Sequence, residues 1–362
     1  MGVSEQKAQL LLDWYIGLQR HIVMTPSFHP LLEKTFPYVP EAYEDLTQAR
    51  EIFRKLSKFV LQAPDEPIRK LVIEAIADYQ KQRLRFEAPT GVFGEAPAET
   101  LMHLREKGWV RLPSLPDEVW MPIRDAILKE PTYHYRDAHF ERPLSLAEAR
   151  TSENVAMLAT PTLLKIPEIK DLVNNREVIA LVAAYLGCVP FLLFPTAWWS
   201  FATATEAKNA QLFHFDLDDL KFCKLFIYLT DVDTETGPHV YMESTHTSQF
   251  ILEAAAKSPD GEEEFLDWYR KELRKPDQEV IDRVGREPLL ITGKAGSMFI
   301  VDTKGLHKGQ LPVADDRLVC QFTYGVTPNL VGHPVEALQP PDTSMPMRER
   351  KIYRYMNRMF LA

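Results

Sequence analysis

The stretch Gln211-Leu-Phe-His-Phe-Asp-Leu-Asp-Asp-Leu220 carries the main signal for fold and chemistry. Its alternating apolar positions predict a strand over residues 212–216, with His214 and Asp216 two residues apart near its end. Residues i and i+2 of a strand point to the same face, so one imidazole and one carboxylate can reach a single metal ion. A His-x-Asp pair alone more often makes a surface hydrogen bond, and the rest of the chain must support the metal hypothesis.

That support lies downstream, in Val301-Asp-Thr-Lys-Gly-Leu-His-Lys-Gly-Gln310. This segment is typical of a strand followed by a glycine-containing turn, which presents His307. Two histidines and one carboxylate on one face of iron leave three positions open, and this suits a bidentate 2-oxoacid together with O₂. Arg317 follows ten residues later, just before an apolar strand. A buried arginine there is suited to bind the distal carboxylate of 2-oxoglutarate.

Other residues compete for these roles. His239 and His246 are alternatives to His307, but the order Ser244-Thr-His246 favours a structural turn for His246. Asp218 and Asp219 are rival carboxylates, and we expect Asp218 to lie behind the ligands or on the surface. Lys224 and Gln211 are weaker candidates for co-substrate contacts. Of the neighbouring Trp198 and Trp199, one faces opposite to the other on a strand, so one is expected to line the substrate cavity.

Strand signals dominate the middle and the end of the chain. They predict strands over 189–201, 212–216, 222–232, 239–242, 297–302 and 318–326, and several short antiparallel strands of this kind indicate a jelly roll. Helical spacing appears on both sides, at 46–60, 68–79, 177–186 and 352–360, and in a charged insertion at 249–285. We therefore expect an α+β protein with a helical extension over residues 1–97, a core over 98–330 and a tail over 331–362 that ends in a short helix.

Composition narrows the function classes. The chain has 362 residues and is 45% hydrophobic, which allows a sizeable core. Its net charge of −9 disfavours nucleic acid and anionic membranes as partners. The three cysteines are scattered in apolar stretches and are expected to be buried, reduced thiols. No targeting segment and no run of roughly 18 apolar residues is apparent, so we expect a cytoplasmic protein.

These motifs, taken in order, resemble the phytanoyl-CoA dioxygenase family of Fe(II)- and 2-oxoglutarate-dependent oxygenases. The matching segments span roughly residues 98–327, and besides His214-x-Asp216 they are Gly108-Trp-Val-Arg-Leu-Pro-Ser-Leu-Pro-Asp117, Lys224-Leu-Phe-Ile-Tyr-Leu-Thr-Asp-Val-Asp233, Gly237-Pro-His-Val-Tyr241, Ser244-Thr-His246 and residues 307–317. The resemblance implies a double-stranded β-helix (jelly-roll, cupin-like) core that uses Fe(II), 2-oxoglutarate and O₂. One departure is Gly309, where family members often carry a hydroxyl two residues after the distal histidine.

The resulting hypothesis is a dioxygenase that oxidises a small organic metabolite, with hydroxylation as the default outcome and release of succinate and CO₂. Its expected metal ligands are His214, Asp216 and His307, and its expected co-substrate contacts are Arg317, Lys224 and Gln211. Desaturation, cyclisation or epoxidation stays open, because these reactions differ in substrate placement rather than in metal ligands. Asp216 argues against a halogenase, because the related halogenating enzymes have a small residue in place of this acid.

Two further alternatives stay open. The chain could be a jelly-roll binding protein that retains the fold without catalysis. Helices before residue 90 are expected to cover the cavity mouth, or to form a homodimer contact through Ile68, Leu71, Val72 and Ile76.

Overall fold

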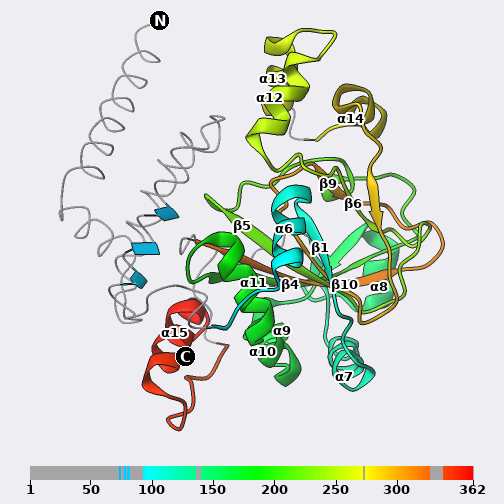
Figure 1. Cartoon of the computed structure of the whole chain (residues 1–362). Helices are drawn as coiled ribbons and strands as arrows, with labels where there is room; N and C mark the ends of the chain where they lie inside the picture. The colour runs from blue at the N-terminus through cyan, green and yellow to red at the C-terminus, as the bar shows by residue number, and fades with distance from the viewer. Residues whose placement is uncertain are drawn as a thin grey trace, which may run out of the picture.

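The computed structural model describes residues 93–135, 140–271, 274–326 and 337–361, together with Ile73, Glu74, Ala77, Asp78, Gln80 and Lys81. The helical faces expected over 46–60 and 68–79, and the proposed homodimer stripe, therefore lie almost wholly outside the described residues. Within them the protein is α+β, with helices around two antiparallel sheets (Figure 1).

The larger sheet has seven strands in the order β1-β8-β5-β10-β4-β3-β2. Every neighbouring pair is antiparallel, and the longest pairing joins β4 to β10 in a register that sets Arg317 opposite Ser200. The strands are β1 (Trp109–Leu112), β2 (Tyr133–His134), β3 (Val155–Met157), β4 (Phe191–Ser200), β5 (Phe222–Tyr228), β8 (Met298–Val301) and β10 (Arg317–Gly325).

The smaller sheet has three strands in the order β7-β6-β9. These are β6 (His239–Tyr241), β7 (Leu289–Ile291) and β9 (His307–Gly309). One hydrophobic cluster takes side chains from both sheets, with Phe226, Tyr228 and Val319 from the larger sheet and Tyr241 and Ile291 from the smaller. The two sheets therefore face each other, and the functional cavity lies between them.

The strand expected over 212–216 is the one strand prediction that is wrong. Phe213 and His214 make only isolated bridges, to Lys275 and His307 respectively, and the chain turns away after them. Asp216 instead donates its backbone N–H to the carbonyl of Thr303 at 2.8 Å. His214 thus adds a single rung to the edge of the smaller sheet, and the loop beyond it delivers Asp216.

Helices cover the outer face of the larger sheet. They are α6 (Ala98–Lys107), α7 (Asp117–Ile127), α8 (Leu146–Ser152), α9 (Thr160–Leu164), α10 (Pro167–Val173), α11 (Arg176–Leu186) and α15 (Met347–Asn357), and the largest core cluster joins most of them to the sheet. Asn175 caps the start of α11, and Gly187 ends it in the left-handed conformation, at φ 83°. Ser145 and Glu148, which have the Ser-x-x-Glu spacing of a capping box, form one at the start of α8. None of the helices in the described ranges has the length and apolar character needed to cross a membrane.

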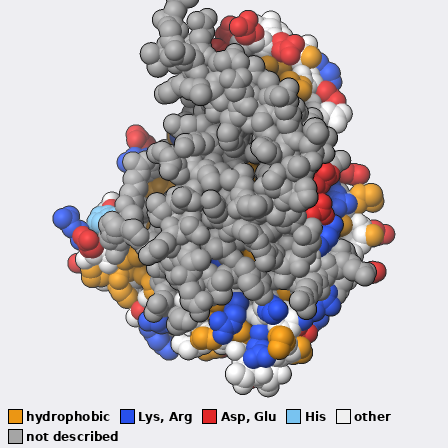
Figure 2. Space-filling model, turned by 90° about the vertical axis from the view of Figure 1, so that its left-hand side faces the viewer, with side chains coloured by type: hydrophobic (Ala, Val, Ile, Leu, Met, Phe, Trp, Pro, Cys, Tyr) orange, Lys and Arg blue, Asp and Glu red, His pale blue; other side chains and the backbone are white. Residues whose placement is uncertain are grey.

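The insertion over 249–285 is helical, as predicted. It folds into α12 (Ser248–Ala256), α13 (Glu262–Lys271) and α14 (Asp277–Val284), which stand above the sheets in Figure 1. Figure 2 shows acidic side chains gathered at this upper end, where α13 begins with Glu262, Glu263 and Glu264. Its buried face forms a cluster of its own, which also contains Phe213, the residue before His214. The insertion therefore supports the loop that presents His214.

Candidate metal centre

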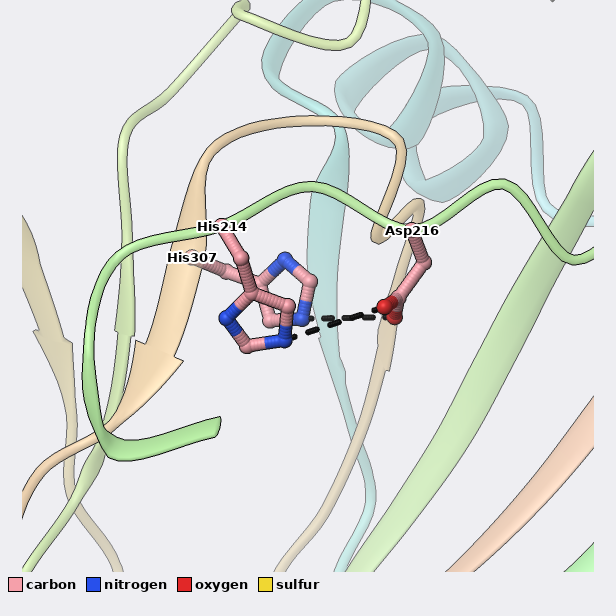
Figure 3. A group of neighbouring side chains, drawn as sticks. All are labelled: His214, Asp216 and His307. Atoms are coloured by element: carbon pink, nitrogen blue, oxygen red, sulfur yellow. Dashed lines mark ion pairs between the residues drawn. The ribbon is translucent and has the colours of Figure 1, made fainter. Parts of the chain in front are cut away.

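His214, Asp216 and His307 converge in the cavity between the sheets (Figure 3). One ligand atom from each lies within 4.8 Å of the other two. Both imidazoles present Nε2 to the carboxylate, with His214 Nε2 3.7 Å from Asp216 Oδ1 and His307 Nε2 3.4 Å from Asp216 Oδ2. Three side chains from two distant segments thus meet at one point, in an arrangement that fits a divalent transition metal.

The two histidines are oriented in the same way. His214 Nδ1 lies 2.9 Å from the carbonyl oxygen of Leu212, and His307 Nδ1 lies 2.9 Å from the carbonyl oxygen of Gly305. A carbonyl only accepts, so each Nδ1 carries the proton and each Nε2 is left with a free lone pair. Metal-binding histidines in proteins are commonly held by such a bond on the other ring nitrogen.

Burial keeps the imidazole of His214 neutral. It lowers the pKa of His214 to about 3, and the neighbouring His307 contributes to the shift. Neutral imidazole is the form that binds a metal ion. Burial also acts to raise the pKa of Asp216, but the nearby charge of Lys224 opposes it, and that pKa lies well below its usual range. Asp216 is therefore a carboxylate at neutral pH.

A short turn over residues 302–306 holds two of the three side chains. The carbonyl of Thr303 accepts the backbone N–H of Asp216, and the carbonyl of Gly305 accepts Nδ1 of His307. The turn is anchored by Asp302, whose Oδ2 accepts a hydrogen bond of 2.5 Å from the hydroxyl of Tyr185 on α11. Its backbone carbonyl accepts the hydroxyl of Tyr241 at 3.0 Å. The positions of Asp216 and His307, two of the three candidate ligands, thus depend on a buried network behind them.

Lys224 joins two carboxylates beside the ligands. Its Nζ lies 2.6 Å from Asp216 Oδ2 and 2.7 Å from Asp218 Oδ2. Burial would lower the pKa of Lys224, but the two carboxylates outweigh it and the pKa is raised. Asp218, expected behind the ligands or on the surface, lies in the cavity wall as the second partner of this lysine.

Arg317 is buried at the other side of the same cavity, where its side chain is 3% exposed. Its Nη2 donates to Ser200 Oγ at 3.0 Å, and its Nη1 donates to the carbonyl of Gly237. It forms no ion pair with any residue in the described ranges, and burial lowers its pKa. Gly309 leaves space for it, since a Cβ at that position would lie 3.0 Å from Nη2.

The cavity has a volume of about 330 Å³ and is lined by residues of both sheets. Gln211 lies in its wall, with Oε1 accepting from Asn154 Nδ2 at 2.9 Å and from the backbone N–H of Lys208 at 3.0 Å. Trp198 also lines the cavity, whereas Trp199 is buried in the core, as the strand alternation predicts. The structure therefore brings all six predicted site residues to one cavity: His214, Asp216, His307, Arg317, Lys224 and Gln211.

The alternative ligand candidates lie outside the group formed by His214, Asp216 and His307. His246 Nε2 contacts the carbonyl oxygen of Arg105, and Asp219 accepts the backbone N–H groups of Leu220 and Val326. His239 does line the cavity, with its ring stacked at 5.4 Å on that of His307, yet it is not part of the ligand group. Cys188, Cys223 and Cys320 are buried and free, as expected.

Sequence reasoning missed Ser200, Asp302 and Tyr185. The strand ends and the turn were visible in the sequence, but no local signal shows that these side chains contact Arg317 or the 302–306 turn. Only the register of β4 against β10 and the packing of α11 bring them there.

No family model and no curated protein matches the chain. Solved structures do resemble it. SnoK, a non-haem α-ketoglutarate-dependent carbocyclase from nogalamycin biosynthesis, is 19% identical over 63% of this chain and 83% of SnoK, with a TM-score of 0.42. The epimerase SnoN, solved with Fe³⁺, α-ketoglutarate and nogalamycin RO, is 14% identical over 62% and 82%, at 0.42. HygX from Streptomyces hygroscopicus, solved with nickel and 2-oxoglutarate, is 16% identical over 63% and 87%, at 0.43.

Proposed function

We propose that the protein is an Fe(II)- and 2-oxoglutarate-dependent oxygenase with a double-stranded β-helix core over residues 98–330, of the phytanoyl-CoA dioxygenase type. Its substrate is a small organic molecule, and hydroxylation is the default outcome. The observation that carries the proposal is the convergence of His214, Asp216 and His307, with both Nε2 lone pairs directed at one point and both Nδ1 atoms bonded to backbone carbonyls. That donor set is typical of non-haem Fe(II).

The three side chains would hold Fe(II), which when bound with 2-oxoglutarate and O₂ supplies the oxidation of a second substrate, with release of succinate and CO₂. The residues of the chain orient the participants. Hydrogen bonds to Leu212 and Gly305 fix both imidazole rings, and Lys224 fixes the carboxylate of Asp216. Apolar and aromatic side chains of the cavity wall, among them Met157, Phe194, Trp198 and Phe226, limit the access of water.

Arg317 supports 2-oxoglutarate as the co-substrate. A buried guanidinium without an acidic partner in the described ranges is costly, because an unpaired buried charge destabilises a protein by several kcal/mol, about 3–5 when one partner of a pair is removed. A carboxylate delivered by the ligand would provide the missing partner. Strand β9 connects the candidate metal ligands to Arg317. His307 and Gly309 lie on the same face of this strand, and Gly309 is next to the guanidinium of Arg317.

The principal rival is a binding protein of the same fold that holds a metal or ligand without catalysis. The two views differ in one measurement, the formation of succinate from 2-oxoglutarate by the purified protein with Fe(II) in air. The wild-type protein is expected to form succinate, at a low rate without a second substrate and at a higher rate with the correct one. A protein that binds both Fe(II) and 2-oxoglutarate but forms no succinate across a metabolite screen is the binding protein.

Single substitutions test the assignment of the ligands. His307→Ala and Asp216→Ala should each abolish iron-dependent succinate formation with little change in fold, because a triad that lacks one member holds Fe(II) poorly. His246→Ala is the matched control and should affect stability rather than iron binding, since His246 contacts Arg105 instead of the triad. The ligand assignment is wrong if His246→Ala loses iron and His307→Ala retains it.

A further inference from the structure

The residues next to the candidate metal ligands face the helical insertion instead of the metal cavity. The three ligands line that cavity, whereas Phe213, Phe215 and Lys308, their neighbours in the chain, do not. Phe213 and Phe215 pack in the hydrophobic cluster formed by α12, α13 and α14, and Lys308 reaches the start of α14. Successive side chains of an extended chain point to opposite faces, which explains this division. The insertion therefore contacts the back of both segments that carry ligands.

An ion pair joins the insertion to β9 at the residue after His307. Lys308 Nζ lies 2.5 Å from Oδ2 of Asp277, in the first turn of α14. The lysine side chain is only 10% exposed, so salt and water screen this pair less than a pair on the open surface. The same Nζ lies 5.3 Å from the centre of the Phe213 ring. Lys308 thus connects the insertion both to β9 and to the segment that carries His214.

The other segment is held by a backbone hydrogen bond and by an aromatic pair. Lys275, between α13 and α14, donates its backbone N–H to the carbonyl of Phe213 at 2.9 Å. The ring of Phe215 stacks on that of Tyr269 in α13, with 4.8 Å between the ring centres and 11° between the planes. The two phenylalanines stand on either side of His214, so these contacts hold the backbone that carries this ligand.

We propose that the insertion over residues 249–285 is part of the metal centre, because it clamps both ligand-carrying segments from behind and thereby sets the affinity for the metal ion. The positioning residues of this clamp are Lys308 with Asp277 and Phe215 with Tyr269. The inference rests on the proposed function, since it concerns the same metal centre. An insertion that needed only to bury its apolar face could pack on any part of the sheets, but these contacts fall on residues adjacent to the ligands.

Titration of the metal-free full chain with Co²⁺, followed by calorimetry and by the visible absorption of the bound ion, tests the clamp. Direct partners of metal ligands typically contribute about tenfold to a hundredfold to metal affinity. Lys308 acts one step further away, through its own backbone, so Lys308→Met and Asp277→Asn should each raise the Kd of Co²⁺ by about fivefold. The double variant should be no weaker than either single variant, because both act through one ion pair.

Two further readouts separate positioning from general stability. The visible bands of bound Co²⁺ depend on the arrangement of its ligands, so they should change in Lys308→Met and return in Lys308→Arg, which keeps the charge. Coupling between two sites is reciprocal, so bound Co²⁺ must in turn stabilise the clamp. Hydrogen exchange of the α14 amides should therefore slow when Co²⁺ binds to the wild-type protein, and this slowing should be lost in Lys308→Met.

Phe215→Leu tests the aromatic half of the clamp. It keeps an apolar side chain in the cluster but removes the stack on Tyr269, and aromatic pairs contribute beyond the area they bury. The Kd of Co²⁺ should rise by about threefold. Phe215→Tyr, which keeps the ring, should retain the wild-type Kd.

Lys271→Met is the matched control for the ion pair. Lys271 Nζ also lies 2.5 Å from a carboxylate of the insertion, Oδ2 of Asp267, but this exposed pair lies within α13. The substitution should leave the Kd and the spectrum of Co²⁺ unchanged.

The clamp is wrong if the variants at Lys308, Asp277 and Phe215 retain the wild-type Kd and spectrum, or if Lys271→Met weakens Co²⁺ binding as much as they do. It is also wrong if bound Co²⁺ leaves hydrogen exchange in α14 of the wild-type protein unchanged. A wild-type protein that binds Co²⁺ but not 2-oxoglutarate contradicts the proposed function alone, because the clamp concerns only the metal ligands.

Discussion

The hydroxyl of Tyr185 is expected to control metal affinity although it contacts no metal ligand. It donates a 2.5 Å hydrogen bond to Asp302, which anchors the turn that holds Asp216 and His307. Tyr185→Phe removes this bond to a charged acceptor, and such bonds contribute about 1.5–3 kcal/mol. Removal of outer partners of metal ligands typically weakens metal binding by about 10- to 100-fold. We expect a loss of about 2 kcal/mol in the free energy of unfolding and about tenfold weaker metal binding.

The assay combines two measurements on the metal-free protein. Urea unfolding gives the change in stability, and calorimetric titration with Co²⁺ gives the change in metal affinity. Tyr324→Phe is the control, because Tyr324 is also fully buried and its hydroxyl also donates one hydrogen bond, to the carbonyl of Val173. Its loss should cost about 0.5–1.5 kcal/mol of stability, as for a neutral acceptor, and should leave Co²⁺ affinity unchanged.

The reasoning is refuted if Tyr185→Phe loses stability but binds Co²⁺ as tightly as the wild-type protein. The turn would then be held by its backbone bonds alone, such as the bond from the N–H of Asp302 to the carbonyl of Gly108 at 2.7 Å. Equal weakening of Co²⁺ binding in Tyr185→Phe and Tyr324→Phe would contradict it as well, because the effect would then follow general destabilisation.

Three further outcomes are expected. A metal ion at 100 times its Kd should stabilise the protein by about 2.7 kcal/mol, and His307→Ala should abolish this effect in thermal unfolding. Lys224→Met should destabilise the metal-free protein by about 3 kcal/mol, because Asp216 and Asp218 lose their shared cation, and added metal should recover part of the loss; an unchanged unfolding midpoint would contradict this. Trp268→Ala should cost about 3–5 kcal/mol by emptying the core of the helical insertion, and limited proteolysis should then cleave the insertion first.

Periodicity and residue spacing were sufficient to predict the parts of the structure that depend on local signals. The strand at 191–200, the helix at 176–186 and the capping box at Ser145 follow from alternation, helical spacing and cap residues. The contact between His214 and His307 was also predictable. Each histidine lies next to a strand-like run of sequence, and two histidines with one carboxylate are a typical set of metal ligands. For the strand, the helix and the capping box, a short segment of sequence contains the physical cause.

The strand expected at residues 212–216 shows where such signals fail. Its alternation is that of a strand, but a strand also needs a partner over several residues, and His307 offers only one rung. The carbonyl of Thr303 takes the next backbone N–H, that of Asp216. Tertiary contacts thus override the local preference, and they do so where the chain must turn to bring Asp216 back toward the two histidines.

The same limit explains Gly309 and Ser200. In the sequence, Gly309 stands where members of the similar family often carry a hydroxyl, and Ser200 lies more than a hundred residues away from it. In the structure, the register of β4 against β10 sets Ser200 opposite Arg317, while the bare backbone of Gly309 leaves space for the guanidinium between them. The hydroxyl of Ser200 and the open space at Gly309 thus both lie beside Arg317. A side chain at position 309 would compete with Arg317 for that space, so the guanidinium would have to move to accommodate it.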